Sequence, residues 1–365
     1  MASNISYKGN MRFLLHGATN WKSSNFGDFL YAYEMFDFFK TLNPDNKVSF
    51  FEPSKYFKKY IKNCDVDNIT IKNADYLVYI PGGYFGEGHN AKLLSTLIQF
   101  VRFMPFGLLG SILKKKMLVV GVGAGPIDRL IMKLPIKVIC NQSLLLTTRD
   151  DISVKALNDL GINNVANYSD MMLAYDLNSI SQVTKQIELI KDFSQHKKIL
   201  LVHYNHSEKA LDLFSQAVTS FVQSHTEYKV VVASDSILPY ENQYFEQFRD
   251  ACNVDCWHFI YDNPYELIEL INIVDTVLTC KLHVGVVACM FNKSVICAAE
   301  HPEKTFRFYD QINKKSHCVS LYESSARQIE SLLENYHKQR IYIPQEELEK
   351  SKKHWFAIQE IIGSN

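Results

Sequence analysis

Short apolar runs alternate with longer helical patterns along most of the chain. The runs contain four or five residues, mainly β-branched, aliphatic or aromatic, and such runs separated by helical segments predict parallel βαβ units. One series of predicted strands comprises 13–16, 48–51, 77–80, 118–121 and 144–148, and a second comprises 199–203, 229–233, 257–260, 276–280 and 295–298.

A polar segment, Asn178–Lys198, separates the two series and shows no strand pattern, so we interpret it as an inter-domain connection. We therefore predict an N-terminal Rossmann-like domain over 1–177, a C-terminal Rossmann-like domain over 178–345, and a helix within 346–365 that crosses back toward the first domain. Two doubly wound α/β domains facing a cleft give a GT-B-like fold, in which ligands bind outside the carboxyl ends of the strands.

Charge and cysteine content narrow the classes of partner. The 39 basic and 39 acidic residues cancel, so no overall field recruits nucleic acid, and we expect no nucleic-acid partner. The eight cysteines are scattered through apolar segments, which suits buried thiols in a reducing compartment. The start, MASNISYKGN, lacks the charged and apolar regions of a signal peptide. These features predict a cytoplasmic protein; they indicate no particular oligomeric state.

One long apolar stretch, Leu93–Leu113, is interrupted by Arg102 and Pro105 and is followed by Lys114-Lys115-Lys116. It falls short of the roughly 18 uncharged apolar residues that a spanning helix needs. Two interpretations stay open. The stretch is a pair of packed helices with a basic end, or it is a surface that dips into the inner face of the membrane, with its lysines at the headgroups.

Three strand-to-helix junctions are rich in glycine. In Asn25-Phe26-Gly27-Asp28, Gly27 permits close approach of the backbone and Asp28 can cap the next helix. Pro81-Gly82-Gly83-Tyr84-Phe85-Gly86 is either a plain turn or one whose amides face an anion or a sugar. Gly121-Val122-Gly123-Ala124-Gly125-Pro126 lacks the third glycine of a dinucleotide fingerprint, so we interpret it as a glycine-lined wall of the cleft.

Two acidic or basic residues end strands of the first half. Arg149, in Thr147-Thr148-Arg149-Asp150, suits a phosphate or carboxylate because a guanidinium offers a bidentate fork. A surface pair with Asp150 is the alternative explanation. Asp170 lies near the end of the first half, and we expect it at the same edge of the sheet as Arg149. Helix capping is its alternative role.

The junction Thr279-Cys280-Lys281-Leu282-His283 is the most informative. Lys281 and His283 alternate around Leu282, so both reach the predicted cleft if Leu282 packs inward. His283 is then a candidate general acid or base, although many histidines are simply satisfied surface or core groups. Lys304 and Arg307 follow the next predicted strand and either add cations or form a solvated helix face.

Other groupings predict no metal site. Asp65-Val66-Asp67 has the spacing of a metal–nucleotide motif but equally suits a loop. Cys252, Cys256 and His258 lack a fourth zinc ligand. His203-Tyr204-Asn205-His206 follows the first strand of the second half, and the sequence assigns it no role.

Taken in order, the glycine-rich junctions, Arg149-Asp150 and Lys281-Leu282-His283-Val284-Gly285 resemble the polysaccharide pyruvyl transferase family over about residues 12–315. The family's arginine before a helix falls on Arg149, and the histidine of its Arg-Leu-His-Gly-type segment falls on His283. This sequence departs from the family in having Lys281 in place of arginine and Val284 inserted before Gly285. Lysine keeps the charge but not the bidentate fork.

The resemblance implies phosphoenolpyruvate as donor, no cofactor, and a hexose or N-acetylhexosamine of a surface glycan as acceptor. Both lipid-linked and free acceptors stay open. It implies an acceptor side in the first domain and a donor side in the second. We expect His283, Asp28 and Asp170 to be catalytic. We expect Arg149, Lys281, Leu282, Lys304 and Arg307 to bind the donor, and Asn25, Gly82, Gly83, Tyr84 and Gly123 to line the cleft.

Two rival functions remain at this point. One is a GT-B glycosyltransferase, whose cleft cations would hold the diphosphate of a sugar nucleotide. The other is a non-catalytic glycan-binding protein of the same fold.

Overall fold

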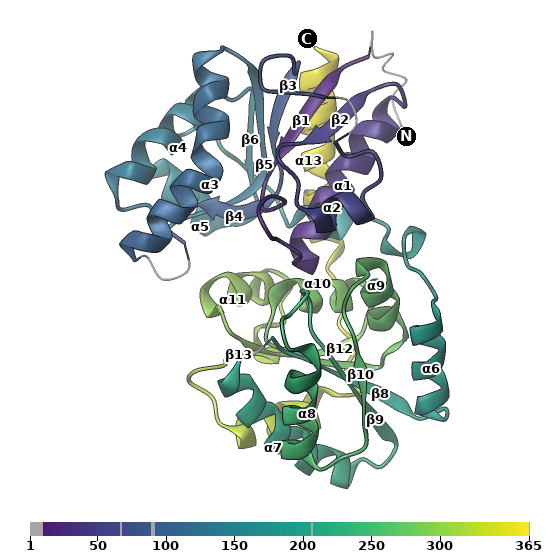
Figure 1. Ribbon diagram of the computed structural model, residues 1–365. Coiled ribbons are helices and arrows are strands. Elements are labelled where there is room, and N and C mark those ends of the chain that lie inside the picture. The colour runs from purple at the N-terminus through teal and green to yellow at the C-terminus, as the bar shows by residue number, and fades with distance from the viewer. Residues whose placement is uncertain (1–9, 66–67, 89–91, 206, 365) are drawn as a thin grey trace. The chain divides into compact units, whose positions relative to one another are not determined.

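The computed structural model describes residues 10–65, 68–88, 92–205 and 207–364. These form two compact units (Figure 1). The first comprises residues 1–24, 28–175 and 346–365, and the second comprises 25–27 and 176–345. Asp67 and His206, considered above, and the first nine residues lie outside the described residues.

The first unit contains a parallel sheet with the strand order β2-β1-β3-β5-β6-β7, and β4 pairs with β5 beyond that path. Because β2 lies outside β1, the chain reverses its direction of travel between β1 and β3, as in flavodoxin-like sheets. The strands are β1 (Arg12–His16), β2 (Lys47–Phe50), β3 (Tyr76–Tyr79), β4 (Gly82–Phe85), β5 (Lys116–Ala124), β6 (Leu145–Thr148) and β7 (Ala166–Asn167).

Helices follow most strands of the first unit and cover its sheet (Figure 1). Strands such as β3 are buried along their whole length, as expected for a parallel sheet with helices on both faces. The helices are α1 (Phe26–Leu42), α2 (Lys55–Tyr60), α3 (Leu93–Ile112), α4 (Leu130–Gln142), α5 (Asp151–Asn158), the 3-10 helix η1 (Met171–Ala174) and α13 (Gln345–Gly363).

The second unit contains a six-stranded parallel sheet with the order β10-β9-β8-β11-β12-β13. This is the 3-2-1-4-5-6 order of a Rossmann domain, and its switch point lies between β8 and β11. The strands are β8 (Lys198–His203), β9 (Tyr228–Ala233), β10 (Cys256–Phe259), β11 (Thr276–Thr279), β12 (Ser294–Ala299) and β13 (Cys318–Ser320). The helices are η2 (Leu177–Ser179), α6 (Lys185–Ser194), α7 (Glu208–Ser224), α8 (Glu241–Cys252), α9 (Pro264–Ile273), α10 (Leu282–Met290), α11 (Pro302–Gln311), η3 (Lys315–His317) and α12 (Ala326–Tyr336).

The expected two-domain α/β fold is confirmed, and each of the ten predicted strands is present. Three details were wrong. The Gly82–Phe85 segment is a strand rather than a turn, because its backbone pairs with β5. Asn178–Lys198 is not a plain connection, since it contains α6, whose apolar positions are buried. Leu93–Ile112 is one helix, not two; the carbonyl that Pro105 leaves unbonded belongs to Val101, which is exposed.

A buried histidine attaches α13 to the first sheet. Thr147 Oγ1 accepts the N–H of Gly121 and lies 2.8 Å from His354 Nδ1, while His354 Nε2 lies 2.9 Å from the carbonyl oxygen of Ser169. A neutral ring that accepts at Nδ1 and donates at Nε2 satisfies all of these groups. Burial lowers the pKa of His354 to about 4.

We expect acid to destabilise the first unit partly through His354. Between about pH 6.5 and about pH 4, His354 is protonated in the unfolded chain but neutral in the folded chain. The free energy of unfolding therefore decreases as the pH falls through this range. His354→Asn should remove up to about 3 kcal/mol of that pH dependence. Trp355, whose ring lies 4.4 Å from that of Phe38, provides the fluorescence signal for urea unfolding at each pH. His196 is exposed, so the His196→Asn variant should keep the wild-type dependence of the free energy of unfolding on pH. The same pH dependence in both variants would contradict the role of His354.

Candidate functional site

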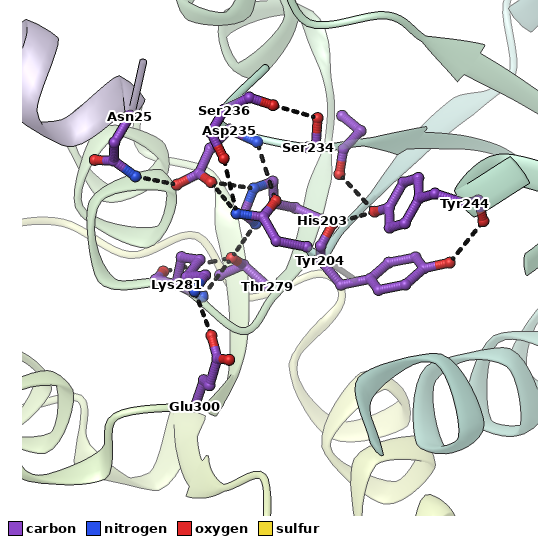
Figure 2. Close-up of polar contacts among 12 residues, drawn as sticks. Asn25, His203, Tyr204, Ser234, Asp235, Ser236, Tyr244, Thr279, Lys281 and Glu300 are labelled. Carbon is purple, nitrogen blue, oxygen red and sulfur yellow. Dashed lines mark hydrogen bonds and ion pairs between the residues drawn. The ribbon is translucent and has the colours of Figure 1, made fainter. Parts of the chain in front are cut away.

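The carboxyl ends of the second unit's strands carry a connected group of polar side chains (Figure 2). His203 ends β8, Asp235 follows β9, Thr279 ends β11, and Glu300 follows β12. Because β8 and β11 flank the switch point, His203 and Thr279 stand side by side there, with Nδ1 and Oγ1 2.8 Å apart. This is where doubly wound sheets bind ligands.

The His203 ring contacts Thr279 on one side and Asp235 on the other. Thr279 Oγ1 accepts the backbone N–H of Lys281 at 3.0 Å, and its hydroxyl donates either to His203 Nδ1 at 2.8 Å or to the carbonyl oxygen of Lys281 at 3.4 Å. Nε2 of His203 faces Asp235 Oδ1 at 3.8 Å. His203 and Asp235 are both buried, so the pair is shielded from solvent.

Asp235 is the best-supported charge in this group. Its carboxylate accepts amide hydrogens from Asn205 and from Asn25, the latter at 3.3 Å, and its backbone carbonyl accepts the N–H of Phe26 at 2.8 Å. Burial alone raises the pKa of Asp235, but His203, Lys281 and Asn205 outweigh burial and hold the pKa well below its usual range. The carboxylate therefore stays ionised, and Asn25 lies in this group rather than only at a helix start.

Lys281 and His283 stand at the start of α10. The ammonium of Lys281 is hydrogen-bonded to the carboxylate of Glu300. Burial opposes its charge, yet Cys280, Asp235 and Glu300 raise the pKa of Lys281, so it stays a cation. Leu282 is buried and its neighbours are half-buried, as the alternation predicted. The side chain of Leu282 therefore contacts core rather than a ligand, because it is packed inward.

Two glycines allow the close packing around His283. A Cβ atom on Gly27 would overlap the His283 ring, and one on Gly285 would overlap the hydroxyl of Tyr309. Lys304 and Arg307 lie on α11, which follows β12, and both side chains are half-buried. They therefore do not form a fully solvated helix face.

In the first unit, a buried arginine ends the sheet. Arg149 Nη1 donates to Tyr31 Oη at 2.8 Å and lies 3.5 Å from Asp170 Oδ2, and Tyr31 in turn donates to the same oxygen at 2.6 Å. Burial opposes the charge of Arg149, but Tyr31 and Asp170 raise its pKa, so the guanidinium stays charged. Asp170 also caps η1 by accepting the N–H of Met172 at 3.1 Å. Arg149 is thus paired with Asp170, not with Asp150 as a surface pair.

The other edge of the Arg149 guanidinium faces two glycines. A Cβ atom on Gly123 would lie 3.5 Å from Nη2, 3.7 Å from Nε and 3.4 Å from the Cα of Gly83. Gly83 is exposed and would have no atom within 4 Å of a Cβ. Within the described residues, Nε and Nη2 make no hydrogen bond, so this edge can donate to an anion.

Three other residues from the sequence analysis lie as follows. Asp28 is half-buried in the first turn of α1 and accepts the hydroxyl of Ser23 at 3.4 Å. Tyr84 is buried, its ring stacks on Phe103 and its hydroxyl donates to the carbonyl of Ile80. Gly82 is buried beneath the Tyr84 ring. Of the glycine-rich segment, only Gly83 is therefore exposed.

The described residues contain no group of three or more histidine, cysteine, aspartate or glutamate side chains arranged to hold a metal ion. Cys252 Sγ accepts a hydrogen bond from the Thr219 hydroxyl, and the His258 ring stacks on Phe245 with ring centroids 4.5 Å apart.

The family model for polysaccharide pyruvyl transferase matches residues 25–302. The chain belongs to the polysaccharide pyruvyl transferase family. No curated protein matches its sequence. Arg149, Lys281 and His283 all fall within the matched segment of this pyruvyl transferase family member.

Solved structures similar to this family member at low identity include UDP-GlcNAc 2-epimerases. That of Neisseria meningitidis bound to UDP-GlcNAc has a TM-score of 0.62 at 11% identity, over 97% of this chain and 100% of that one. That of Methanocaldococcus jannaschii has a TM-score of 0.61 at 12% identity, over 98% and 100%. S. aureus MnaA with UDP has a TM-score of 0.61 at 11% identity, over 96% of each chain. These likenesses show a GT-B-like fold.

In this family member His203 has no role predicted from sequence, and Asp235, Tyr31 and Glu34 were not predicted as site residues. Tyr31 and Glu34 lie on α1, and Glu34 is a buried carboxyl whose pKa is raised by burial and by Asp170 and Asp37. One signal was available for Asp235. It follows an apolar strand, and it lies at the carboxyl-end edge of the parallel sheet, where His203 and Thr279 also lie.

Asp235→Asn should destabilise this family member by about 3 kcal/mol, the usual cost of breaking a buried charged contact. Asn205 donates to Oδ1 and Asn25 donates to Oδ2, so asparagine would place an NH2 donor against one of these two donors. It also removes the charge that faces His203 and Lys281. Asp255→Asn is the matched control, because Asp255 pairs with Lys229 while 67% exposed and should cost less than about 1 kcal/mol. Equal midpoints for both variants in urea unfolding would show that the Asp235 charge is not needed for stability.

Proposed function

We propose that this chain transfers the pyruvyl group of phosphoenolpyruvate to a hexose or N-acetylhexosamine of a surface-polysaccharide precursor. The observation that carries the proposal is the family match over residues 25–302. It is supported by the open edge of the buried Arg149 guanidinium beside Gly83 and Gly123, since a planar fork of donors suits a carboxylate or phosphate.

The proposed reaction needs a proton, a base and cations. A proton adds to the methylene carbon of the donor, and a sugar hydroxyl oxygen bonds to the adjacent carbon as it loses its own proton. The carbon–oxygen bond to phosphate then breaks, and a second hydroxyl of the same sugar replaces the phosphate to close a cyclic ketal. The products are the ketal and inorganic phosphate, and no metal, nucleotide or cofactor enters the balance.

We assign His283 as the acid that protonates the methylene carbon, because imidazole titrates near neutral pH and this ring is only half-buried. Arg149 and Lys281 are assigned to the anionic donor. Leu282 would contribute its backbone amide at the start of α10, where unpaired N–H groups favour phosphate. Lys304 and Arg307 on the next helix are proposed as further cations for the donor.

For the acceptor hydroxyl we favour Asp28 as the base and Asp170 as a positioning residue. Asp170 already accepts hydrogen bonds from Tyr31, Arg149 and Met172, so its oxygens are largely occupied. Its effect would be to hold Arg149 in place. Asp28 is half-buried at the first turn of α1, where it accepts the hydroxyl of Ser23 at 3.4 Å.

We further propose a cytoplasmic location, because seven of the eight thiols are buried and all are unpaired, as suits a reducing compartment. The main rival is an enzyme that uses a sugar nucleotide, since the similar solved structures are described as binding UDP or UDP-GlcNAc. Their identity of 11% shows the fold alone. A glycan-binding protein without catalysis is the other rival.

Donor binding separates these rivals. Saturating phosphoenolpyruvate should raise the melting temperature, because about 100 times Kd adds roughly 2.7 kcal/mol to stability. Arg149→Lys should weaken the donor roughly 10- to 100-fold, since a single ammonium replaces a charged fork, while the exposed Arg327→Lys keeps the wild-type affinity. Stabilisation by UDP-GlcNAc but not by phosphoenolpyruvate would reject the proposal. If Arg149→Lys instead unfolds the protein while the folded fraction binds donor normally, the role of Arg149 is structural.

Turnover tests the role of His283. His283→Ala should lower the rate of phosphate release roughly 10²–10⁴-fold, the usual effect of losing a general acid, with little change in melting temperature. The assay combines phosphoenolpyruvate with a panel of lipid-linked and soluble sugars and follows phosphate and the mass of the product. His196→Asn, an exposed histidine elsewhere, controls for unspecific effects. Undiminished turnover in His283→Ala would remove it from the mechanism, and tolerance of both His283→Ala and Arg149→Lys in the cell would favour the glycan-binding rival.

A further inference from the structure

Helices α3 and α4 of the first unit expose many large apolar side chains. Of the 22 large hydrophobic residues exposed in the described part of the chain, 11 lie on α3, on α4 or at the C-cap of α3. Such a concentration on one surface marks an interaction site, whereas single exposed hydrophobics are ordinary. The eleven are Leu93, Leu94, Leu97, Ile98, Val101, Leu109, Ile112, Leu113, Leu130, Leu134 and Val138.

These residues recur at helical spacing on each helix. Leu94, Ile98 and Val101 line one side of α3, and Leu130, Leu134 and Val138 stand four residues apart on α4. The opposite sides are buried, so the stripes are outer faces of helices that are folded into the first unit.

The two helices lie side by side (Figure 1) and pack closely. A Cβ atom on Gly107 of α3 would lie 2.7 Å from the side chain of Ile139 on α4. The stripes therefore belong to one continuous two-helix surface, called here the α3/α4 face.

The two helices of the α3/α4 face carry only positive charges, although the exposed Asp128 lies two residues before α4. Neither 93–112 nor 130–142 contains an aspartate or a glutamate. Lys92 and Lys114 flank α3 and are exposed, Lys133 and Lys137 alternate with the stripe of α4, and Lys137 is exposed. The basic cluster expected at 114–116 is smaller than its sequence suggests, since Lys115 donates to the carbonyls of Lys72 and Ala74 and Lys116 lies over the Tyr76 ring.

From this combination we infer that the α3/α4 face docks on the surface of an anionic lipid bilayer. Apolar side chains enter the boundary of the acyl chains while the lysines meet the headgroups, as in interfacial amphipathic helices. By length and composition α3 could also cross a membrane, but a third of its apolar window is buried in the fold, so we infer a helix that lies in the interface.

Charge favours lipid over a second copy of this chain as the occupant. A symmetric dimer through this face would bring lysines against lysines with no carboxylate on either helix to pair with them. Arg102, which interrupts α3, fits the lipid proposal as well. It is bonded to Asn20 at 2.7 Å and lies over the exposed ring of Trp21, and tryptophan is enriched at membrane interfaces.

Vesicle co-sedimentation measures membrane binding and requires no pyruvyl transfer. Its result therefore tests the membrane inference independently of the proposed function. The wild-type protein should bind vesicles containing phosphatidylglycerol at low salt, and more weakly at high salt or with phosphatidylcholine alone. Lys133→Glu/Lys137→Glu should bind at least roughly tenfold more weakly, at about 1 kcal/mol per lysine. Leu130→Ser/Leu134→Ser should lose a similar factor with an unchanged melting temperature, because both side chains are largely exposed.

Matched controls carry the same changes on the second unit. Lys185→Glu/Lys338→Glu and Val183→Ser/Leu189→Ser alter exposed residues there and should bind vesicles like the wild type. Absence of vesicle binding by the wild type, or an equal loss in test and control variants, would overturn the inference. A dimer seen by sedimentation that Leu130→Ser/Leu134→Ser dissociates, without vesicle binding, would assign the face to a second copy and also overturn it.

Discussion

A charge buried at the end of a parallel sheet must be matched by partners, and this requirement organises the functional edge of both units. In the second unit the charge is Asp235, and two asparagines, His203 and Lys281 are oriented toward it. In the first unit it is Arg149, held by Tyr31 and Asp170. Because an unmatched buried ion costs several kcal/mol, these contacts specify side-chain positions that packing alone would leave open.

The two charges differ in what they leave available. Asp235 is surrounded by donors on both oxygens, so it is suited to holding His203 and Lys281 in place rather than to reacting. Arg149 uses one nitrogen for its partners and keeps an edge beside two glycines. The first arrangement positions other groups, and the second can still bind an anion.

The sequence predicted the sheets because each strand is a run of apolar residues between helical patterns, and local patterns report local structure. It missed β4 because glycines carry no strand signal, and α6 because a polar surface helix resembles a connection. Lys281 and His283 could be proposed because they are close in sequence. Asp235 could be proposed only from its place after an apolar strand, and Tyr31 had no such signal, since the residues that they contact are 30 or more positions away and the fold brings them together.

The return of α13 to the first unit affects how the chain can fold during synthesis. Residues 346–365 supply Glu347, Ser351 and His354, which bond to Ser169, Met171 and Thr147. Domains generally fold from the N-terminus onward as they leave the ribosome. Here the second unit is complete in the emerging chain while the first still lacks its final helix. The domain made first is therefore finished last, and a nascent chain that stalls before α13 emerges carries a first domain whose α13 contact surface is uncovered.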